Sequence, residues 1–480
     1  MGPKSTKQWV PHEYQRTAEK FIYRNTIAAG PGEHPTGAAL FLDPGLGKTS
    51  ICLQAVQMMK QLGYVRKVLI VAPKRVATKV WPDELAQWSN FKGLTMGVAV
   101  GTAAHRKKIL SNPYLDIYVT NRDSVEWLAA RMKQVKGPRL PWQMIIVDES
   151  TSFKTWGAAR SKALRSLITR IPYRVILTGT PSPKDLTDLF PQVWLLDQGK
   201  ALGENITAFR RDYCVSVGAR KYTKFELRKN VEDTIQNKIA HLCLRLDHKD
   251  YLSMPSLVTQ DVMVDLPSDA MAQYQEMERQ LVLALQDGTR NISGAAALYT
   301  ACRQVANGAI YGDDRQVLQI HDEKIDAVKE IIEELHGKPV LIPYLFDHDA
   351  TRLQKAIRGL TVIRGGMKDK EFAEVIDKWN NGTLNPPHLA VQPKALSFGI
   401  NMQHGAGRDI IWYGLTDSLD DYLQLNARIW RQGVTSQVRI HRILASNTVD
   451  EMVRDRTDQK FDVQTNLLES LRQYAKGLQL

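Results

Sequence analysis

Short apolar runs alternate along the chain with segments of helical periodicity. In the N-terminal part these runs predict strands at residues 38–42, 68–72, 115–120, 143–149 and 175–177. A strand that is covered on both faces reads as a continuous apolar stretch, whereas a covering helix repeats its apolar positions with a period of 3.6. The alternation of these two patterns predicts a doubly wound parallel sheet.

The same pattern returns in the C-terminal part, with strands predicted at 339–344, 360–363, 388–391, 410–413 and 438–443. Between the two regions, residues 256–267 alternate like a strand and 268–307 are helical in pattern. We therefore predict an α/β fold with two parallel-sheet domains in tandem and a helical insertion between them. The expected parts are domain 1 (1–197), a linker or insertion (198–255), a strand plus helical protrusion of domain 2 (256–320), and the rest of domain 2 with C-terminal helices (321–480).

A turn rich in small residues joins the strand at 38–42 to a helix. It consists of Asp43, Pro44, Gly45, Leu46 and Gly47, after which Lys48, Thr49 and Ser50 open the helix. Glycines let backbone N–H groups point at phosphate oxygens, and the helix N-terminus adds positive potential. Lys48 would reach the β- and γ-phosphates of a nucleotide, and the Thr49 hydroxyl would bind Mg²⁺. Because the strict motif has glycine where Leu42 stands, the alternative is an ordinary helix start.

Two carboxylates, Asp148 and Glu149, close the strand at 143–149. Ligands of parallel α/β sheets gather at the carboxyl ends of the strands. Asp148 would hold the Mg²⁺ hydration shell, and Glu149 would orient the attacking water. The alternative is a pair of loop acids. At the end of the next strand, Thr178, Gly179 and Thr180 would sense the γ-phosphate.

Two further short segments are candidates for weaker roles. Tyr14 and Gln15 would clamp an adenine ring, although a helix start with an exposed glutamine is the simpler interpretation. Lys74 and Arg75 follow the strand at 68–72 and would touch a phosphate backbone, with solvated surface charge as an equal alternative.

A helix that starts after Ser418 carries three polar residues on one predicted face. Gln424, Arg428 and Arg431 are spaced i, i+4 and i+7, and Gly433 is expected to end the helix. Two arginines on one face are suited to neutralise phosphate charge in a transition state. The alternative is a helix that pairs with its own acids.

Charge and composition narrow the class of partner. The net charge of +13, from 64 Lys and Arg against 51 Asp and Glu, favours a polyanionic partner such as nucleic acid. No apolar run has the length of a membrane span, and the N-terminus lacks an apolar signal core, so we expect no membrane and a cytoplasmic location in a bacterial or phage-infected cell. The four cysteines lie far apart, so reduced thiols are expected.

The order of these motifs resembles the superfamily-two helicase-like ATPases of the Swi/Snf branch. The segments that carry the resemblance are EYQ (13–15), DPGLGKT (43–49), LIVAPKRVATKVW (69–81), IIVDES (145–150), LTGTPSP (177–183), ALSFGINM (395–402) and QLNARIWRQG (424–433). The short length and the DES-type motif are similar to Snf-like proteins carried by phages and prophages.

The resemblance implies two RecA-like domains with ATP and Mg²⁺ between them. By position, Gln15 would read adenine, and Lys48, Thr49, Asp148 and Glu149 would form the hydrolytic site. Thr178 and Thr180 would couple hydrolysis to motion, and Ser397, Gly399 and Asn401 would link nucleic acid to the nucleotide. Arg428 and Arg431 would be the arginine fingers.

Three departures from the family pattern concern coupling. Ser150 and Thr151 stand where the family has a small residue and a histidine that couples the domains. The run 414–419 replaces the family's Asp-x-x-Trp-Asn-Pro segment, and Trp430 stands where a histidine is common. The hydrolytic residues are intact.

The function expected from this resemblance is a nucleic-acid-stimulated ATPase that translocates along double-stranded DNA. A strand-displacing helicase is a close variant. An ATP-gated nucleic-acid clamp and an RNA helicase are the alternatives. The 198–320 segment is a possible contact for a protein partner.

Overall fold

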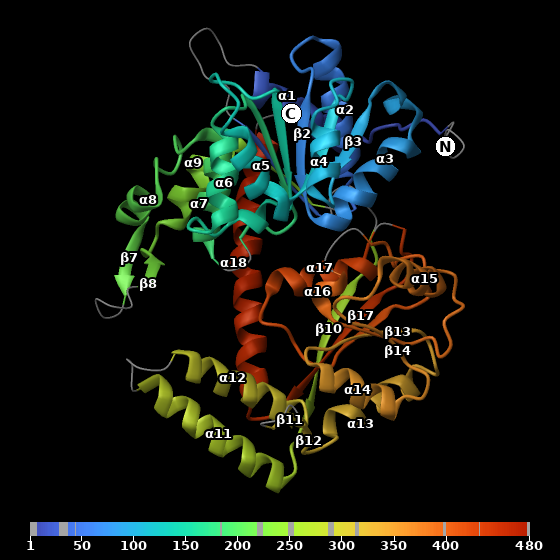
Figure 1. The fold of residues 1–480 in the computed structure, drawn as a ribbon. Coiled ribbons are helices and arrows are strands. Elements are labelled where there is room, and N and C mark those ends of the chain that lie inside the picture. Colours follow the sequence, from blue (N-terminus) through green and yellow to red (C-terminus); the bar gives the residue numbers. More distant parts are fainter. Residues whose placement is uncertain are drawn as a thin grey trace. The chain divides into compact units, whose positions relative to one another are not determined.

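The computed structural model describes residues 7–27, 37–43, 45–182, 185–217, 224–247, 254–286, 292–312, 316–396, 400–431 and 433–477 (Figure 1). The chain forms two compact units. Unit 1 comprises Met1–Leu252 and Lys460–Leu480, and unit 2 comprises Ser253–Gln459. Each unit is built around its own parallel sheet.

The sheet of unit 1 has seven strands in the described residues, in the order β3-β4-β2-β5-β6-β1-β9, and every neighbouring pair is parallel. The strands are β1 (Ala38–Leu42), β2 (Val68–Ala72), β3 (Met96–Ala99), β4 (Ile117–Asn121), β5 (Met144–Asp148), β6 (Tyr173–Thr178) and β9 (Cys243–Leu246). All residues of β1, β2, β4 and β5 are buried, which explains why these strands are apolar apart from polar residues at the carboxyl ends of β4 and β5.

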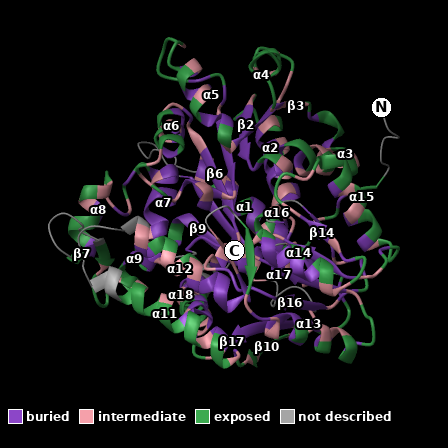
Figure 2. Cartoon of the chain, turned by 60° about the horizontal axis from the view of Figure 1, so that its bottom comes forward, coloured by how far each residue is buried: buried purple, intermediate pink, exposed green. Residues whose placement is uncertain are grey.

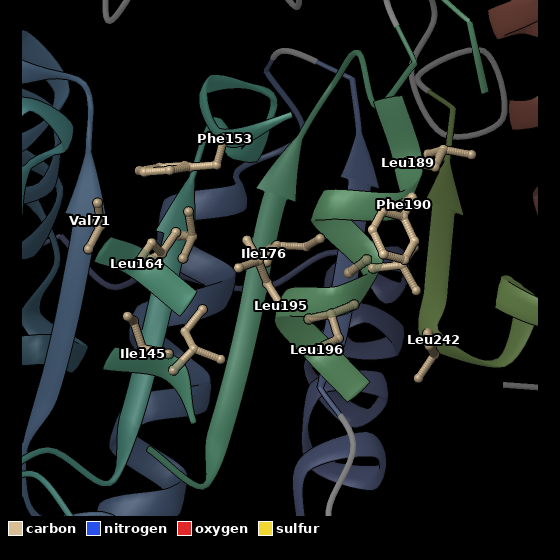
Figure 3. Close-up of a cluster of buried hydrophobic side chains, with 14 of the residues drawn as sticks. Val71, Ile145, Phe153, Leu164, Ile176, Leu189, Phe190, Leu195, Leu196 and Leu242 are labelled. Atoms are coloured by element: carbon tan, nitrogen blue, oxygen red, sulfur yellow. The ribbon is translucent and has the colours of Figure 1, made fainter. Parts of the chain in front are cut away.

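Helices cover this sheet and complete its core. They are α1 (Glu13–Ile27), α2 (Lys48–Gln61), α3 (Trp81–Gln87), α4 (Ala103–Leu110), α5 (Val125–Met132), α6 (Ala159–Ile168), α7 (Leu189–Asp197), α8 (Ile206–Tyr213) and α9 (Glu232–Ile239). Figure 3 shows apolar side chains of α6 and α7, among them Leu164, Phe190 and Leu196, packed with Ile145 and Ile176 of the sheet. A short antiparallel hairpin, β7 (Cys214–Val217) with β8 (Lys224–Leu227), projects from this unit.

The sheet of unit 2 has six strands in the described residues, in the order β10-β17-β16-β13-β15-β14, again all parallel. The strands are β10 (Leu257–Val264), β13 (Val340–Pro343), β14 (Thr361–Ile363), β15 (Leu389–Val391), β16 (Asp409–Trp412) and β17 (Val438–Ala445), and β11 (Ala309–Tyr311) pairs separately with β12 (Val317–Gln319). The helices are α11 (Ser268–Gln286), α12 (Ile292–Ala306), α13 (Glu323–Glu334), α14 (Asp347–Ala356), α15 (Asp369–Asn380), α16 (Pro393–Leu396), α17 (Leu419–Ile429) and α18 (Val449–Gly477).

Most strands of the two sheets are buried, but the edge strand β10 has no buried residue. Among the helices, α4 also has no buried residue (Figure 2). The four cysteines are free and buried. No helix in the described residues is long and apolar enough to cross a membrane.

A buried polar cluster ties several elements of unit 2 together. Lys324 is fully buried, and its Nζ donates to the Asp450 carboxylate and to Asn307 Oδ1 (2.9 Å). Arg352 donates to the carbonyl oxygens of Asn307 and His321. Buried charges are stable only when they are paired in this way, so the cluster fixes α12, α13 and α18 on one another.

The α/β class and the two parallel sheets agree with the prediction from sequence. Two strands of unit 1, β3 and β9, were not predicted, and β9 lies within the 198–255 segment that was expected to be a linker or insertion. Residues 460–480 group with unit 1, since Leu467 and Leu468 belong to its apolar core, whereas the sequence analysis assigned them to domain 2.

Candidate active site

The loop after β1, which the sequence predicts to bind phosphate and which we call the phosphate loop, holds two glycines in the left-handed region. Gly45 and Gly47 have φ angles of +95° and +80°, which side chains with a Cβ rarely adopt. A Cβ on Gly47 would also lie 2.6 Å from Gln15 Nε2. Helix α2 starts at Lys48, whose Nζ donates to the Leu42 carbonyl at 2.7 Å. Lys48 therefore folds back over the loop, where a phosphate would lie. Pro44 lies outside the described residues.

Gln15 is packed against this loop. Its side chain is buried, its Oε1 accepts from the backbone N–H of His12 (2.9 Å), and its Nε2 donates to the Leu46 carbonyl (3.2 Å). Tyr14, also buried, stacks with His12 at 5.4 Å. The simpler interpretation, an exposed glutamine at a helix start, is therefore wrong.

An arginine that the sequence analysis missed holds the first residue of the loop. Arg245 Nη2 lies 2.6 Å from Asp43 Oδ1, and Arg245 Nη1 donates to the Phe41 carbonyl at 3.1 Å. Arg245 comes from β9, which pairs with β1 and is only four residues long. The only local signal is the apolar run 242–246, which Arg245 interrupts.

Ser50, expected among the nucleotide-binding residues, turns its side chain inward. It is buried, and its hydroxyl donates to Glu84, which also accepts from Trp88 Nε1 (2.7 Å). The backbone N–H of Ser50 is in the first turn of α2, where helical N–H groups have no partner within the helix. Any contact between Ser50 and a phosphate would therefore come from its backbone N–H.

The carboxylate pair stands at the end of β5. Asp148 is buried, and its Oδ2 accepts from Trp81 Nε1 at 3.0 Å. Burial raises the pKa of Asp148, although the positive charge of Lys48 and the Trp81 hydrogen bond oppose this rise. Trp81 was missed as a functional residue. It follows the π-helix Val76–Val80, a form of helix that is frequent at functional sites.

Glu149 has an unusual backbone. Its φ is +53° and its ψ is +60°, a left-handed conformation that is uncommon for residues other than glycine. The 3₁₀ turn Ser150–Phe153 follows at once, and Phe153 anchors it in the core (Figure 3). Such conformations persist where the surroundings fix them, often at active sites.

Sheet register brings these groups to one edge. Strands β5, β6 and β1 are neighbours, with Asp148 opposite Leu177 and Phe41 opposite Thr178. The Thr178 hydroxyl accepts from the backbone N–H of Thr180 at 3.1 Å, which shapes the turn around Gly179. The phosphate loop, the carboxylates and the threonines therefore share the carboxyl edge of one sheet. Lys74 and Arg75 follow the carboxyl end of β2, with Lys74 exposed.

In unit 2 the expected arginine helix is shorter than predicted. Ser418 caps α17, accepting from the Asp421 N–H at 3.2 Å, but the helix ends at Ile429 and not at Gly433. Trp430 is extended, and its indole donates to the Pro255 carbonyl at 2.9 Å. Arg431 therefore does not continue the helical face of Gln424 and Arg428.

Both arginines nevertheless contact one segment. Arg428 is buried and donates to the Ile400 carbonyl (3.1 Å), and Arg431 Nη1 donates to Asn401 Oδ1 (2.6 Å). Gln424 is held by Asp420 at 3.0 Å. The structure thus joins Asn401 to the arginines. Ser397 and Gly399 lie outside the described residues.

Comparison with known proteins identifies the family. The model of the SNF2-related domain matches residues 7–308. Protein p41 of Acyrthosiphon pisum secondary endosymbiont phage 1 is 34% identical over 442 residues, which cover 89% of this chain and 93% of that protein.

More distant similarity extends to eukaryotic proteins and to solved structures. The DNA repair and recombination protein RAD54-like of Homo sapiens is 24% identical over 96% of this chain and 66% of its own. The Sulfolobus solfataricus SWI2/SNF2 ATPase core in complex with dsDNA is 19% identical, with a TM-score of 0.45 over 97% of this chain and 95% of that chain. On the family model and the phage relative, this chain belongs to the SNF2-related family of ATP-hydrolysing enzymes.

Proposed function

We propose that this protein is a DNA-stimulated ATPase that uses ATP hydrolysis to move along double-stranded DNA. The observation that carries the proposal is the meeting of the phosphate loop and the carboxylate pair at the shared edge of β5, β6 and β1. Phosphoryl transfer to water needs a phosphate cradle, a metal carboxylate and a residue that orients water, and this edge carries side chains for each.

In this mechanism the loop binds and orients the nucleotide. Backbone N–H groups of Gly45 to Ser50 cradle the phosphates, and Lys48 moves from the Leu42 carbonyl to the β- and γ-phosphates. The Gln15 amide, held beside the loop, reads the adenine edge. Arg245 keeps Asp43, and with it the start of the loop, in place.

The site also fits Mg²⁺, because the Thr49 hydroxyl and the Asp148 carboxylate are the oxygen ligands that this cation prefers. Bound there, Mg²⁺ would neutralise phosphate charge. Trp81 orients the Asp148 carboxylate. Glu149, set in its left-handed conformation, orients the attacking water and takes its proton. Arg428 and Arg431 neutralise charge on the transferred phosphoryl group.

Double-stranded DNA is the proposed partner for three reasons. The chain is basic, with a net charge of +13. Relatives named DNA repair and recombination proteins match nearly the whole chain. Lys74 and Arg75 follow β2, the strand that neighbours the carboxylate strand β5. Thr178 and Thr180, which a hydrogen bond joins, would couple hydrolysis to movement on the DNA. The similarity to a phage protein supports a location in the bacterial host cell.

The test is the steady-state ATPase rate without nucleic acid and with single-stranded DNA, duplex DNA or structured RNA. We expect duplex DNA to stimulate turnover most, and a triplex-displacement assay to show movement. Lys48→Ala should lose turnover, and Glu149→Gln should bind ATP but hydrolyse it at least about 100-fold more slowly. Equal slow rates under all four conditions would contradict the proposal. If RNA stimulated turnover more than DNA, the partner would be RNA.

A further inference from the structure

One buried amide in unit 1 joins two of the segments just described. Gln192, on α7, is fully buried. Its Oε1 accepts from the Ser150 hydroxyl at 2.7 Å. Its Nε2 donates to the Pro181 carbonyl at 2.7 Å and to the Asp188 carbonyl at 2.8 Å. Both N–H groups of the amide are thus used on carbonyl oxygens, which fixes its orientation, because a flipped amide would bring its oxygen against them.

The position of this amide is set by the core. Leu189, Phe190, Leu195 and Leu196 of α7 pack in the apolar core of unit 1, as Figure 3 shows. The polar Gln192 lies among these residues in sequence, at a place where an apolar side chain would otherwise be expected. A buried amide of this kind is stable only when its hydrogen bonds are made.

The two ends of the bridge lie next to residues of the proposed mechanism. Ser150, fully buried, directly follows Glu149 and begins the 3₁₀ turn. Pro181 directly follows Thr178, Gly179 and Thr180. A shift of the threonine turn would therefore strain or break a hydrogen bond to Gln192, and through Ser150 it would act on the backbone of Glu149.

We propose that Gln192 is a positioning residue that couples the turn at 178–181 to Glu149, so that Glu149 orients water efficiently only when the turn is in its DNA-bound state. This inference rests on the proposed function. It accounts for how coupling proceeds although Ser150 and Thr151 replace the usual small residue and histidine. Gln192 does not touch the substrate; it acts through Ser150 and Pro181.

The alternative is a brace that contributes only to stability. A matched control stands at the opposite end of β5. Gln143 precedes that strand, and its Oε1 accepts from the backbone N–H groups of Arg66 (3.1 Å) and Lys67 (2.9 Å). Gln143→Met removes a similar set of hydrogen bonds away from the site. Gln192→Met and Ser150→Ala each break the bridge.

The experiment measures kcat and KM for ATP, with and without duplex DNA, together with the melting temperature of each variant. Gln192→Met and Ser150→Ala should each lower the DNA-stimulated kcat about tenfold, with KM within about twofold. The DNA-stimulated kcat of the double variant should be no lower than that of either single variant, because both substitutions remove the same hydrogen bond. Ser150→Thr keeps a hydroxyl and should keep most of the stimulation, and Gln143→Met should keep all of it.

Three results would overturn the proposal. A ratio of stimulated to basal kcat that stays unchanged in both bridge variants would reduce Gln192 to a brace. If the losses of DNA-stimulated kcat add up in the double variant, Ser150 and Gln192 act independently and do not form one coupling bridge. If Gln192→Met does not fold, Ser150→Ala alone decides. A wild-type protein that DNA does not stimulate would instead reject the proposed function, and this inference with it.

Discussion

Trp81→Phe tests the hydrogen bond between an indole and the proposed metal carboxylate. Trp81 Nε1 and Asp148 Oδ2 are 3.0 Å apart, and both residues are buried. Phenylalanine keeps most of the aromatic packing but has no N–H to donate. The Asp148 carboxylate would then lose one of the groups that oppose the effect of burial on its pKa.

The size of the effect follows from the charge on the acceptor. A hydrogen bond to a charged group contributes about 1.5–3 kcal/mol. Its loss raises the pKa of Asp148 further, because one of the groups that stabilise the charged carboxylate is gone. The same energy corresponds to about 10- to 100-fold weaker binding of Mg²⁺, in line with the loss of other groups that hold metal ligands.

The assay is the ATPase rate at saturating ATP and duplex DNA as a function of free Mg²⁺, at neutral pH and about one unit lower. The Mg²⁺ concentration for half-maximal rate should rise in the variant. It should rise further at the lower pH, because protons and Mg²⁺ compete for Asp148. Trp194→Phe is the control, since it removes an indole donor that binds the Glu204 carbonyl elsewhere in unit 1. An unchanged Mg²⁺ requirement at both pH values would refute the role of Trp81.

Two further predictions concern unit 2. Burial lowers the pKa of His321 from 6.5 to about 4, so between these pH values the unfolded chain binds a proton that the folded chain does not. The free energy of unfolding should therefore fall by up to about 3 kcal/mol as the pH drops through this window. Urea midpoints should fall less in His321→Asn, and an equal fall would contradict the role of His321. Arg303 and Tyr299 of α12 bind Asp417, one residue before the cap of α17. Arg303→Ala should therefore misplace Arg428 and Arg431 and lower the DNA-stimulated kcat about tenfold or more, with nucleotide affinity unchanged. A normal kcat would show that α12 does not position α17; the control is Arg279→Ala, at an exposed ion pair on α11.

The strands that could be predicted from sequence are those buried on both faces. The bounds of β1 and β2 agree with the apolar runs at 38–42 and 68–72, because burial on both faces removes polar residues from the whole strand. β3 is short and contains Gly97, and β9 contains Arg245, so neither gives a continuous apolar signal. The charge of Arg245 is satisfied by Asp43, which follows another strand, β1, and is far away in sequence.

The site could be predicted only as far as its motifs are local. The Lys48 loop and the carboxylate pair lie in contiguous segments, and sheet register brings them together. Trp81 and Gln192 act through hydrogen bonds to Asp148 and Ser150, which are more than 40 residues away in sequence. No hydrophobic periodicity in the sequence predicts either contact. Likewise, Gly433 is a strong local stop signal, yet α17 ends at Ile429, followed by Trp430, which bonds the distant Pro255 carbonyl.

The division of unit 1 into two stretches of chain has a consequence for synthesis. Leu467 and Leu468 belong to the core built mainly by residues before 252, so that core stays incomplete on the ribosome until all of unit 2 has been made. Through that interval the nascent chain carries an uncovered apolar surface, which makes it a client for chaperones. A nonsense mutation shortly before Lys460 would spare every proposed catalytic residue and still yield a protein prone to aggregation.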